Sequence, residues 1–192
     1  GEGRPSDYAI RTNMHALGRY AALCQEQGLV PIVEPEVLMD GTHSIDDCRS
    51  ATDRSLSAVF EELDAQNVDL AGIVLKPNMV LSGSGASDRA PAEEVARQTV
   101  DCFLEHVPAS VPGIAFLSGG QGNEESVVNL DAINKIANRG ALPWELTYSY
   151  GRGLQAAPLA VWKGEVANVA AAQAVFQQRG RDSSVAREGV YS

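Results

Sequence analysis

Apolar residues follow two alternating patterns along this chain. In long segments they recur every third or fourth position, which indicates amphipathic helices, and between these segments they form short unbroken runs, which indicate strands buried on both faces. The first pattern predicts helices over 6–27, 44–66, 91–106, 123–137, 154–162 and 166–179. The second predicts strands over 29–36, 70–79, 113–118 and 144–150.

The alternation of strands and helices predicts an α/β fold with parallel strands, because a helix between two strands carries the chain back to the same end of the sheet. An open doubly wound sheet and a (β/α)8 barrel both fit this order. Each predicted strand carries a polar residue at or near its C-terminal end, namely Glu34, Lys76, Ser118 and Ser149. Four strands that each deliver a polar group to one rim are typical of a barrel active site, so we predict a TIM barrel.

Four strand–helix units make only half of such a barrel and leave two parallel strand edges open. We therefore expect one domain over residues 1–192 that supplies about strands 5–8, the C-terminal half of a larger barrel. Residues 1–28 form a helix before strand 5, residues 29–180 form the four units, and residues 181–192 form a polar tail.

Composition narrows the functional classes. The 192 residues carry a net charge of −10, which opposes binding to nucleic-acid phosphates. Cys24, Cys48 and Cys102 form no Cys-x-x-Cys pair, and an odd count suits reduced thiols in a cytoplasm. No apolar stretch approaches the roughly 18 residues that a membrane span requires. We expect a soluble cytoplasmic protein with neither a membrane nor a nucleic-acid partner.

Lys76 is the charged residue that fits its surroundings least well, because it interrupts an apolar run followed directly by Pro77. A buried ammonium is costly unless it is paired or loses its proton. A neutral amine on a rigid strand is a nucleophile that forms Schiff bases with carbonyl groups. The alternative is a strand-end lysine whose stem reaches solvent.

Glu34 and Glu36 flank Pro35 at the end of the preceding strand. A carboxylate beside a lysine at a barrel rim is a natural proton carrier. The alternative is a pair of solvated charges at a strand exit.

Two glycine-containing turns follow the last two strands. Glycines after Ser118, at 119 and 120, allow backbone N–H groups to face an anion, and a helix begins close behind. The next strand ends in Ser149, Tyr150, Gly151 and Arg152, and a guanidinium is well suited to phosphate. Together the two turns predict a phosphate site.

Other candidates are weaker. His15, His43 and His106 have no metal-ligand spacing, so we predict no metal site. No phosphate-binding loop of the nucleoside-triphosphate type and no dinucleotide-binding glycine pattern is present, so no cofactor is implied. Tyr20 and Trp162 are expected to pack between helices.

Several segments resemble class I fructose-bisphosphate aldolases, in that family's order and near its spacing. They are Val30–Glu36, Leu75–Met79, Phe116–Gln121, Asn129–Asn134 and Ser149–Arg152. The resemblance covers nearly the whole chain and implies a (β/α)8 barrel. In this family, many members carry alanine at the position of Gly153.

The resemblance implies a metal-independent lyase that cleaves fructose 1,6-bisphosphate reversibly into dihydroxyacetone phosphate and glyceraldehyde 3-phosphate. Lys76 matches the Schiff-base lysine, Glu34 the general acid/base, and Glu36 a supporting carboxylate. A further set matches residues that hold the ketone-side phosphate: Ser118, Gly119, Gly120, Ser149, Gly151 and Arg152. The resemblance also implies a homo-oligomer, often a tetramer. The family's aspartate that handles the C4 hydroxyl proton lies on strands outside this sequence, and Tyr191 does not match the tyrosine of the family's C-terminal tail.

Two alternatives stay open. One is a non-catalytic sugar-phosphate binder or scaffold of aldolase ancestry, and the other is a metal- or cofactor-dependent barrel lyase.

Overall fold

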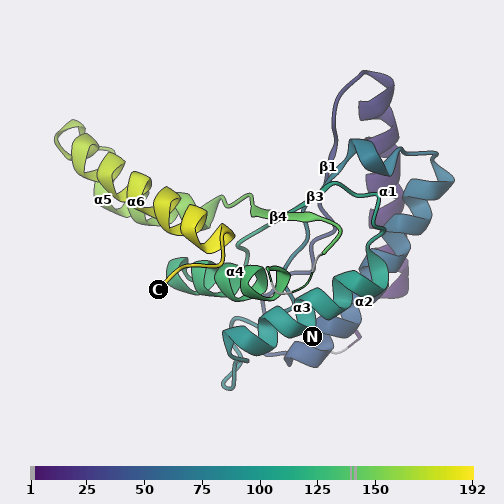
Figure 1. Ribbon diagram of the computed structural model, residues 1–192, viewed down its shortest axis with the longest axis horizontal. Coiled ribbons are helices and arrows are strands. Elements are labelled where there is room, and N and C mark those ends of the chain that lie inside the picture. The colour runs from purple at the N-terminus through teal and green to yellow at the C-terminus, as the bar shows by residue number, and fades with distance from the viewer. Residues whose placement is uncertain (1–2, 139, 141) are drawn as a thin grey trace.

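The computed structural model describes residues 3–138, 140 and 142–192, which form one sheet surrounded by helices (Figure 1). The strands are β1 (Ile32–Val33), β2 (Val74–Leu75), β3 (Gly113–Phe116) and β4 (Glu145–Tyr148). The α-helices are α1 (Asp7–Glu26), α2 (Ile45–Ala65), α3 (Ala92–His106), α4 (Asn123–Ala137), α5 (Arg152–Trp162) and α6 (Val169–Arg187). Short 3₁₀ turns, η1 (Leu70–Gly72) and η2 (Val166–Asn168), precede β2 and α6.

The four strands are parallel and lie in chain order, β1-β2-β3-β4, as the alternation of elements predicts. Each strand is shorter than its apolar run. Pro31 and Pro35 bracket β1, and Pro77 follows β2 closely, so the chain lacks the N–H groups that would lengthen these ladders. Within the described residues, β1 and β4 each pair with one strand only, which leaves the two expected open edges.

Helices α1 and α2 begin near their predicted positions because side chains cap them. Ser44 accepts a hydrogen bond from the backbone of Asp47, whose carboxylate accepts one in return, and this capping box starts α2. Ser6 caps α1 in the same way.

The prediction that the last helix ends near 179 and leaves a polar tail from 181 is wrong. The helix α6 continues to Arg187 because Ser183 and Ala186, both fully buried, pack against the rest of the molecule. Tyr191 then returns to α4, where its backbone N–H donates to Asp131 and its hydroxyl to Glu124.

The core lies between the sheet and the helices α1 to α4, which wrap around one side of it (Figure 1). Phe103 of α3 stacks on Phe116 of β3 with ring centroids 5.7 Å apart. Helices α5 and α6 form a pair that projects from the other end of the sheet. Among the described residues, no helix combines the length and apolar content that a membrane crossing needs.

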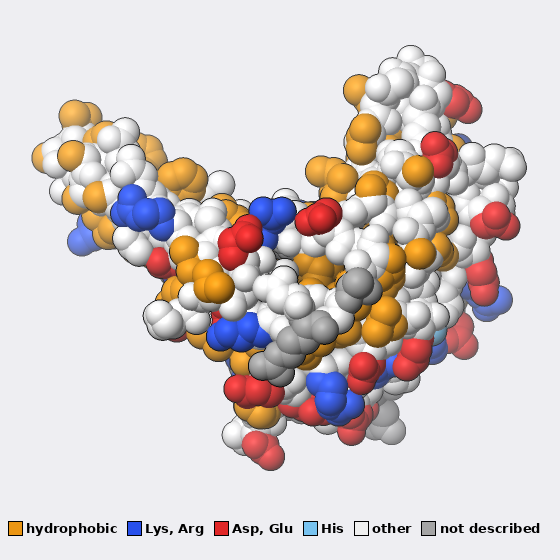
Figure 2. Space-filling model, in the orientation of Figure 1, with side chains coloured by type: hydrophobic (Ala, Val, Ile, Leu, Met, Phe, Trp, Pro, Cys, Tyr) orange, Lys and Arg blue, Asp and Glu red, His pale blue; other side chains and the backbone are white. Residues whose placement is uncertain are grey.

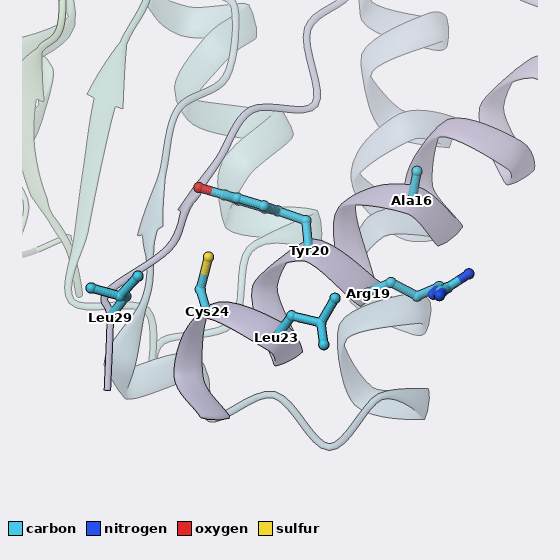
Figure 3. A pocket seen from close by; sticks show the side chains of 6 residues that line it. All are labelled: Ala16, Arg19, Tyr20, Leu23, Cys24 and Leu29. Carbon is cyan, nitrogen blue, oxygen red and sulfur yellow. The ribbon is translucent and has the colours of Figure 1, made fainter. Parts of the chain in front are cut away.

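Apolar side chains remain uncovered on the two flanks of the sheet. Beside β1 they include Tyr20, Leu23, Leu29, Val30 and Ile32, and on the projecting pair Leu159, Trp162 and Phe176. An apolar hollow of about 470 Å³ opens beside α1, with Tyr20, Leu23 and Leu29 in its wall (Figure 3). The expectation that Tyr20 and Trp162 are packed between helices is therefore wrong in this structure, because both are more than 40% exposed.

Candidate functional site

The carboxyl ends of the four strands meet at one rim of the sheet. Backbone hydrogen bonds continue the ladder past the strand ends: Lys76 N donates to Val33 O at 2.7 Å, and Ser149 N donates to Phe116 O at 2.8 Å. Lys76 and Ser149 therefore have fixed backbone positions. Figure 2 shows that the surface is hollowed between the projecting pair α5–α6 and the part of the molecule that contains α1. Acidic and basic side chains lie side by side at the bottom of this hollow.

Lys76 and Glu34 are in contact at this rim. The lysine Nζ lies 3.0 Å from the glutamate Oε1, and the two side chains are 20% and 40% exposed. Ile73 and Leu75 point into the core, whereas Val74 and Lys76 lie on the opposite face and are half-buried. The prediction that this strand is buried on both faces is thus wrong for the Lys76 face, where ion pairing with Glu34 offsets the cost of partial burial.

Glu36 stands between the lysine and the turn after β3. One of its carboxylate oxygens lies only 2.8 Å from the point where a Cβ on Gly119 would be, so this glycine makes room for it. Partial removal from water raises the pKa of Glu36, and the nearby charge of Glu34 raises it further. The positive charges of Arg152 and Lys76 act in the opposite direction.

Asn78 fixes the backbone that carries both glutamates. Its side chain is fully buried, and its Oδ1 accepts a hydrogen bond of 2.9 Å from the backbone N–H of Val37. Its amide nitrogen donates to Thr52 Oγ1 of α2 at 3.1 Å and to Met79 O at 3.0 Å. Sequence reasoning did not single out Asn78, although a polar side chain inside an apolar run after Lys76 is the signal that marks it.

The two glycine-containing turns are joined by a hydrogen bond. Gly153 N, in the first turn of α5, donates to Ser118 Oγ at 3.2 Å. Gly120 has a φ of +73°, and a Cβ there would overlap the side chain of Met39, so glycine is required. An Arg152 Nη2 atom lies 3.8 Å from the point where a Cβ on Gly119 would be, which places the guanidinium beside both turns.

The remaining predicted phosphate residues line the same rim. Ser149 is half-buried directly after β4, and Gly151 is the N-cap of α5, with open space where its side chain would be. The start of α5 therefore points backbone N–H groups toward the rim, an arrangement that favours an anion.

The histidines lie elsewhere. His15 pairs with Glu62, and the half-buried His43 has no hydrogen-bond partner for Nε2 within the described residues. Asp53, Glu105 and His106 have ligand atoms within 4.8 Å of one another. Arg49 binds both carboxylates of this group, at 2.7 and 2.6 Å, so a guanidinium already occupies the position between them.

The arrangement offers a primary amine in contact with one carboxylate and close to a second, whose pKa is raised. Beside them lie a serine hydroxyl, a guanidinium and helix N–H groups. Such a rim is suited to a ligand that carries both a carbonyl and a phosphate, because the amine attacks carbonyl carbon while the turns hold an anion.

Comparisons with known proteins agree on one family. A family model described as fructose-bisphosphate aldolase class-I matches residues 1–192. A probable fructose-bisphosphate aldolase class 1 of Xanthomonas campestris pv. campestris is 49% identical over 98% of this chain and 56% of its own length. The cytosolic fructose-bisphosphate aldolase 4 of Arabidopsis thaliana is 48% identical over 100% of this chain and 48% of its own length.

A solved structure supports the same conclusion about the fold. Fructose-bisphosphate aldolase from Plasmodium falciparum, in a ternary complex with TRAP and a small-molecule inhibitor, matches with a TM-score of 0.94 at 46% identity. The match covers 100% of this chain and 54% of that one. The chain thus spans about half the length of the relatives it matches. The likeness confirms the predicted barrel fold, of which these four strands form a part.

Proposed function

This chain belongs to the class I fructose-bisphosphate aldolase family, and we propose that it supplies the reacting half of such an enzyme. The reaction is the reversible cleavage of fructose 1,6-bisphosphate to dihydroxyacetone phosphate and glyceraldehyde 3-phosphate. The whole chain is one domain, and the strand–helix units that close the sheet lie outside it.

Covalent attachment begins at Lys76. Its Nζ, after giving a proton to Glu34, attacks the ketone carbon, and the carbonyl oxygen takes up a proton to form a carbinolamine. Loss of that hydroxyl as water leaves a protonated imine on Nζ. Glu34 suits this exchange because its oxygen lies 3.0 Å from Nζ, within reach of both proton transfers.

Carbon–carbon cleavage follows from the imine. The C4 hydroxyl loses its proton to a base outside this chain, the C3–C4 bond breaks, and glyceraldehyde 3-phosphate leaves. The electron pair of that bond moves into the imine and forms an enamine. Protonation at C3 and hydrolysis then release dihydroxyacetone phosphate and regenerate Lys76. Glu36, whose raised pKa keeps it protonated to higher pH than an ordinary glutamate, supports the acid steps at the lysine.

The ketone-side phosphate lies at the two turns. Ser118, Gly119 and Gly120 provide a hydroxyl and backbone N–H groups, while Ser149, Gly151 and Arg152 provide a second hydroxyl, a helix start and a guanidinium. Holding the phosphate here places the adjacent ketone over Nζ, and such positioning lowers the barrier before any bond changes.

The contact between Lys76 and Glu34, at the same rim as the paired turns, is the observation that carries this proposal. Its test is an assay of triose phosphate release from fructose 1,6-bisphosphate by the complete barrel, with and without EDTA. We expect equal rates in both. The absence of cleavage would refute the proposal, and a rate abolished by EDTA would indicate metal-dependent chemistry instead.

We further infer that the complete protein acts in the cytoplasm and assembles as a homo-oligomer, with the tetramer as the expected state. Cytosolic and cytoplasmic relatives from Arabidopsis thaliana and Pisum sativum support the location. Sedimentation equilibrium of the purified protein measures the assembly, and a monomer at micromolar concentration would contradict it.

A further inference from the structure

Arg179 is a buried charge that the proposed reaction leaves without a role. It lies on α6, and its side chain is only 9% exposed. A guanidinium carries five N–H donors, and burying it is costly unless these donors find acceptors. Its partners therefore indicate why the fold retains it.

The guanidinium binds backbone carbonyls on two different turns of the rim. Its Nε donates to Gly153 O at 3.1 Å, in the first turn of α5, and its Nη2 donates to Asn123 O, at the start of α4. The remaining nitrogen lies 3.6 Å from Asp182 on the same helix. The planar guanidinium of Arg179 thus connects the segment after β3 with the segment after β4.

This connection extends to a phosphate-binding hydroxyl. Gly153, whose carbonyl is bound by Arg179, donates its own N–H to Ser118 Oγ at 3.2 Å. The two residues are also closely packed, because a Cβ on Gly153 would lie 3.1 Å from Ser118. A shift of Gly153 would therefore displace Ser118.

We propose that Arg179 is a positioning residue for the phosphate site, which holds the Ser118 turn and the Arg152 turn at the spacing that a phosphomonoester requires. This inference rests on the proposed function and deepens it. The planar guanidinium is essential to it, since two different nitrogens bind the two carbonyls and a single ammonium does not present two fixed donors. The charge adds a second effect, because the guanidinium binds Gly153, next to Arg152 in the turn proposed to hold the anion.

The test compares Arg179→Met and Arg179→Lys with wild type in the complete barrel. Steady-state kinetics give kcat and KM for fructose 1,6-bisphosphate, and competition gives the inhibition constant of inorganic phosphate. For Arg179→Met we expect both KM and the phosphate constant to rise about tenfold to a hundredfold, with a smaller fall in kcat, since misplacement by about 1 Å has effects of this size. Arg179→Lys should fall between methionine and wild type.

Ala186→Gly serves as the matched control. It loosens a fully buried position of the same helix, seven residues beyond Arg179, and removes no side-chain hydrogen bond. If Arg179 only anchors α6, all three variants should lower the melting temperature and leave KM and the phosphate constant unchanged, which would overturn the inference. If Arg179→Met does not fold, Arg179→Lys alone decides, because an unchanged phosphate constant in a folded lysine variant also refutes it.

Failure of this inference is distinguishable from failure of the proposed function. With saturating dihydroxyacetone phosphate, borohydride should still attach the substrate to Lys76 in every Arg179 variant. An adduct on Lys76 with unaltered phosphate affinity refutes the role of Arg179 alone. The absence of an adduct in wild type would refute the function on which it rests.

Discussion

The two halves of the rim are built by different means. At the ends of β1 and β2, Lys76 and Glu34 are already in contact, and the buried amide of Asn78 fixes the glutamate-bearing backbone. At the ends of β3 and β4, the site consists of glycine turns, a helix start and the exposed side chain of Arg152. Under the proposed function, the first half makes and breaks bonds and the second holds an anion. Substitutions in the first should therefore lower kcat, and substitutions in the second should raise KM.

The largest effect is expected for Lys76→Met. If Lys76 forms the imine, as proposed, removing its amine should lower kcat by roughly 10⁴-fold or more. The matched control is Lys135→Met, which removes a lysine of α4 that is paired with Asp131. The control should cleave fructose 1,6-bisphosphate at close to the wild-type rate. Substantial activity in Lys76→Met would place the chemistry elsewhere.

Glu34→Gln tests the proton carrier. It keeps the shape of the side chain but removes the base 3.0 Å from Nζ, so kcat should fall by roughly 10²- to 10³-fold, a usual range for loss of an acid–base group. Single-turnover measurements should locate the loss in imine formation. Glu61→Gln, the same change at an exposed glutamate of α2, is the control and should leave that step unaltered.

Arg152→Met tests the other half of the rim. Loss of the guanidinium should raise KM for fructose 1,6-bisphosphate by about tenfold to a hundredfold while kcat changes less. Arg181→Met removes an exposed arginine of α6 that binds only Gln178 among the described residues, and it should have no effect on KM. A fall in kcat alone for Arg152→Met would contradict the division between the two halves.

The pKa of Glu36 reports how close the two halves lie. Glu34→Gln should lower it by removing a like charge, and Arg152→Met should raise it by removing an opposite one. Carbon-13 NMR titration of the Glu36 carboxyl measures both shifts. Because the folded state binds this proton more tightly than the unfolded chain does, Glu36 favours folding at acidic pH. That contribution disappears as the pH rises through its folded pKa. No response to Arg152→Met would mean that the halves are electrostatically separate.

The smallest effect is expected for Gly153→Ala. The added methyl would lie 3.1 Å from Ser118, a distance that a shift of a few tenths of an ångström relieves. Alanine suits a helical position better than glycine, and this gain offsets the crowding, so stability should change by less than about 1 kcal/mol. We expect KM to change by less than about threefold. A change as large as that of Arg152→Met would show that Ser118 has no room to move.

Helices, strands and their pairing could be predicted from the sequence more accurately than the burial of their residues. Helix starts followed from local caps such as Ser44 with Asp47, and parallel pairing followed from the order of elements. Burial was less predictable, because it depends on what covers each face. The apolar run around Lys76 suggested burial on both faces, yet Val74 and Lys76 on one face are only half-buried.

Candidate site residues could be proposed where a charge stood out against an apolar run, as at Lys76 and Glu34, and the structure places these two in contact. Asn78 and Arg179 were not singled out, since their roles depend on partners more than 25 residues away in the chain, Thr52 and Gly153. The end of α6 was also missed. Its last turns contain Arg181, Asp182, Ser183 and Ser184, a polar stretch that is typical of a tail, and only tertiary packing reveals that Ser183 is buried.

Borohydride trapping tests the central claim most directly. The complete barrel is reduced in the presence of dihydroxyacetone phosphate, digested and mapped by mass spectrometry. This chain contains three lysines, Lys76, Lys135 and Lys163, so the peptides that it contributes are easily told apart. We predict a substrate adduct on Lys76, and none on the other two. An adduct confined to another lysine, or no adduct in an active protein, would contradict the account.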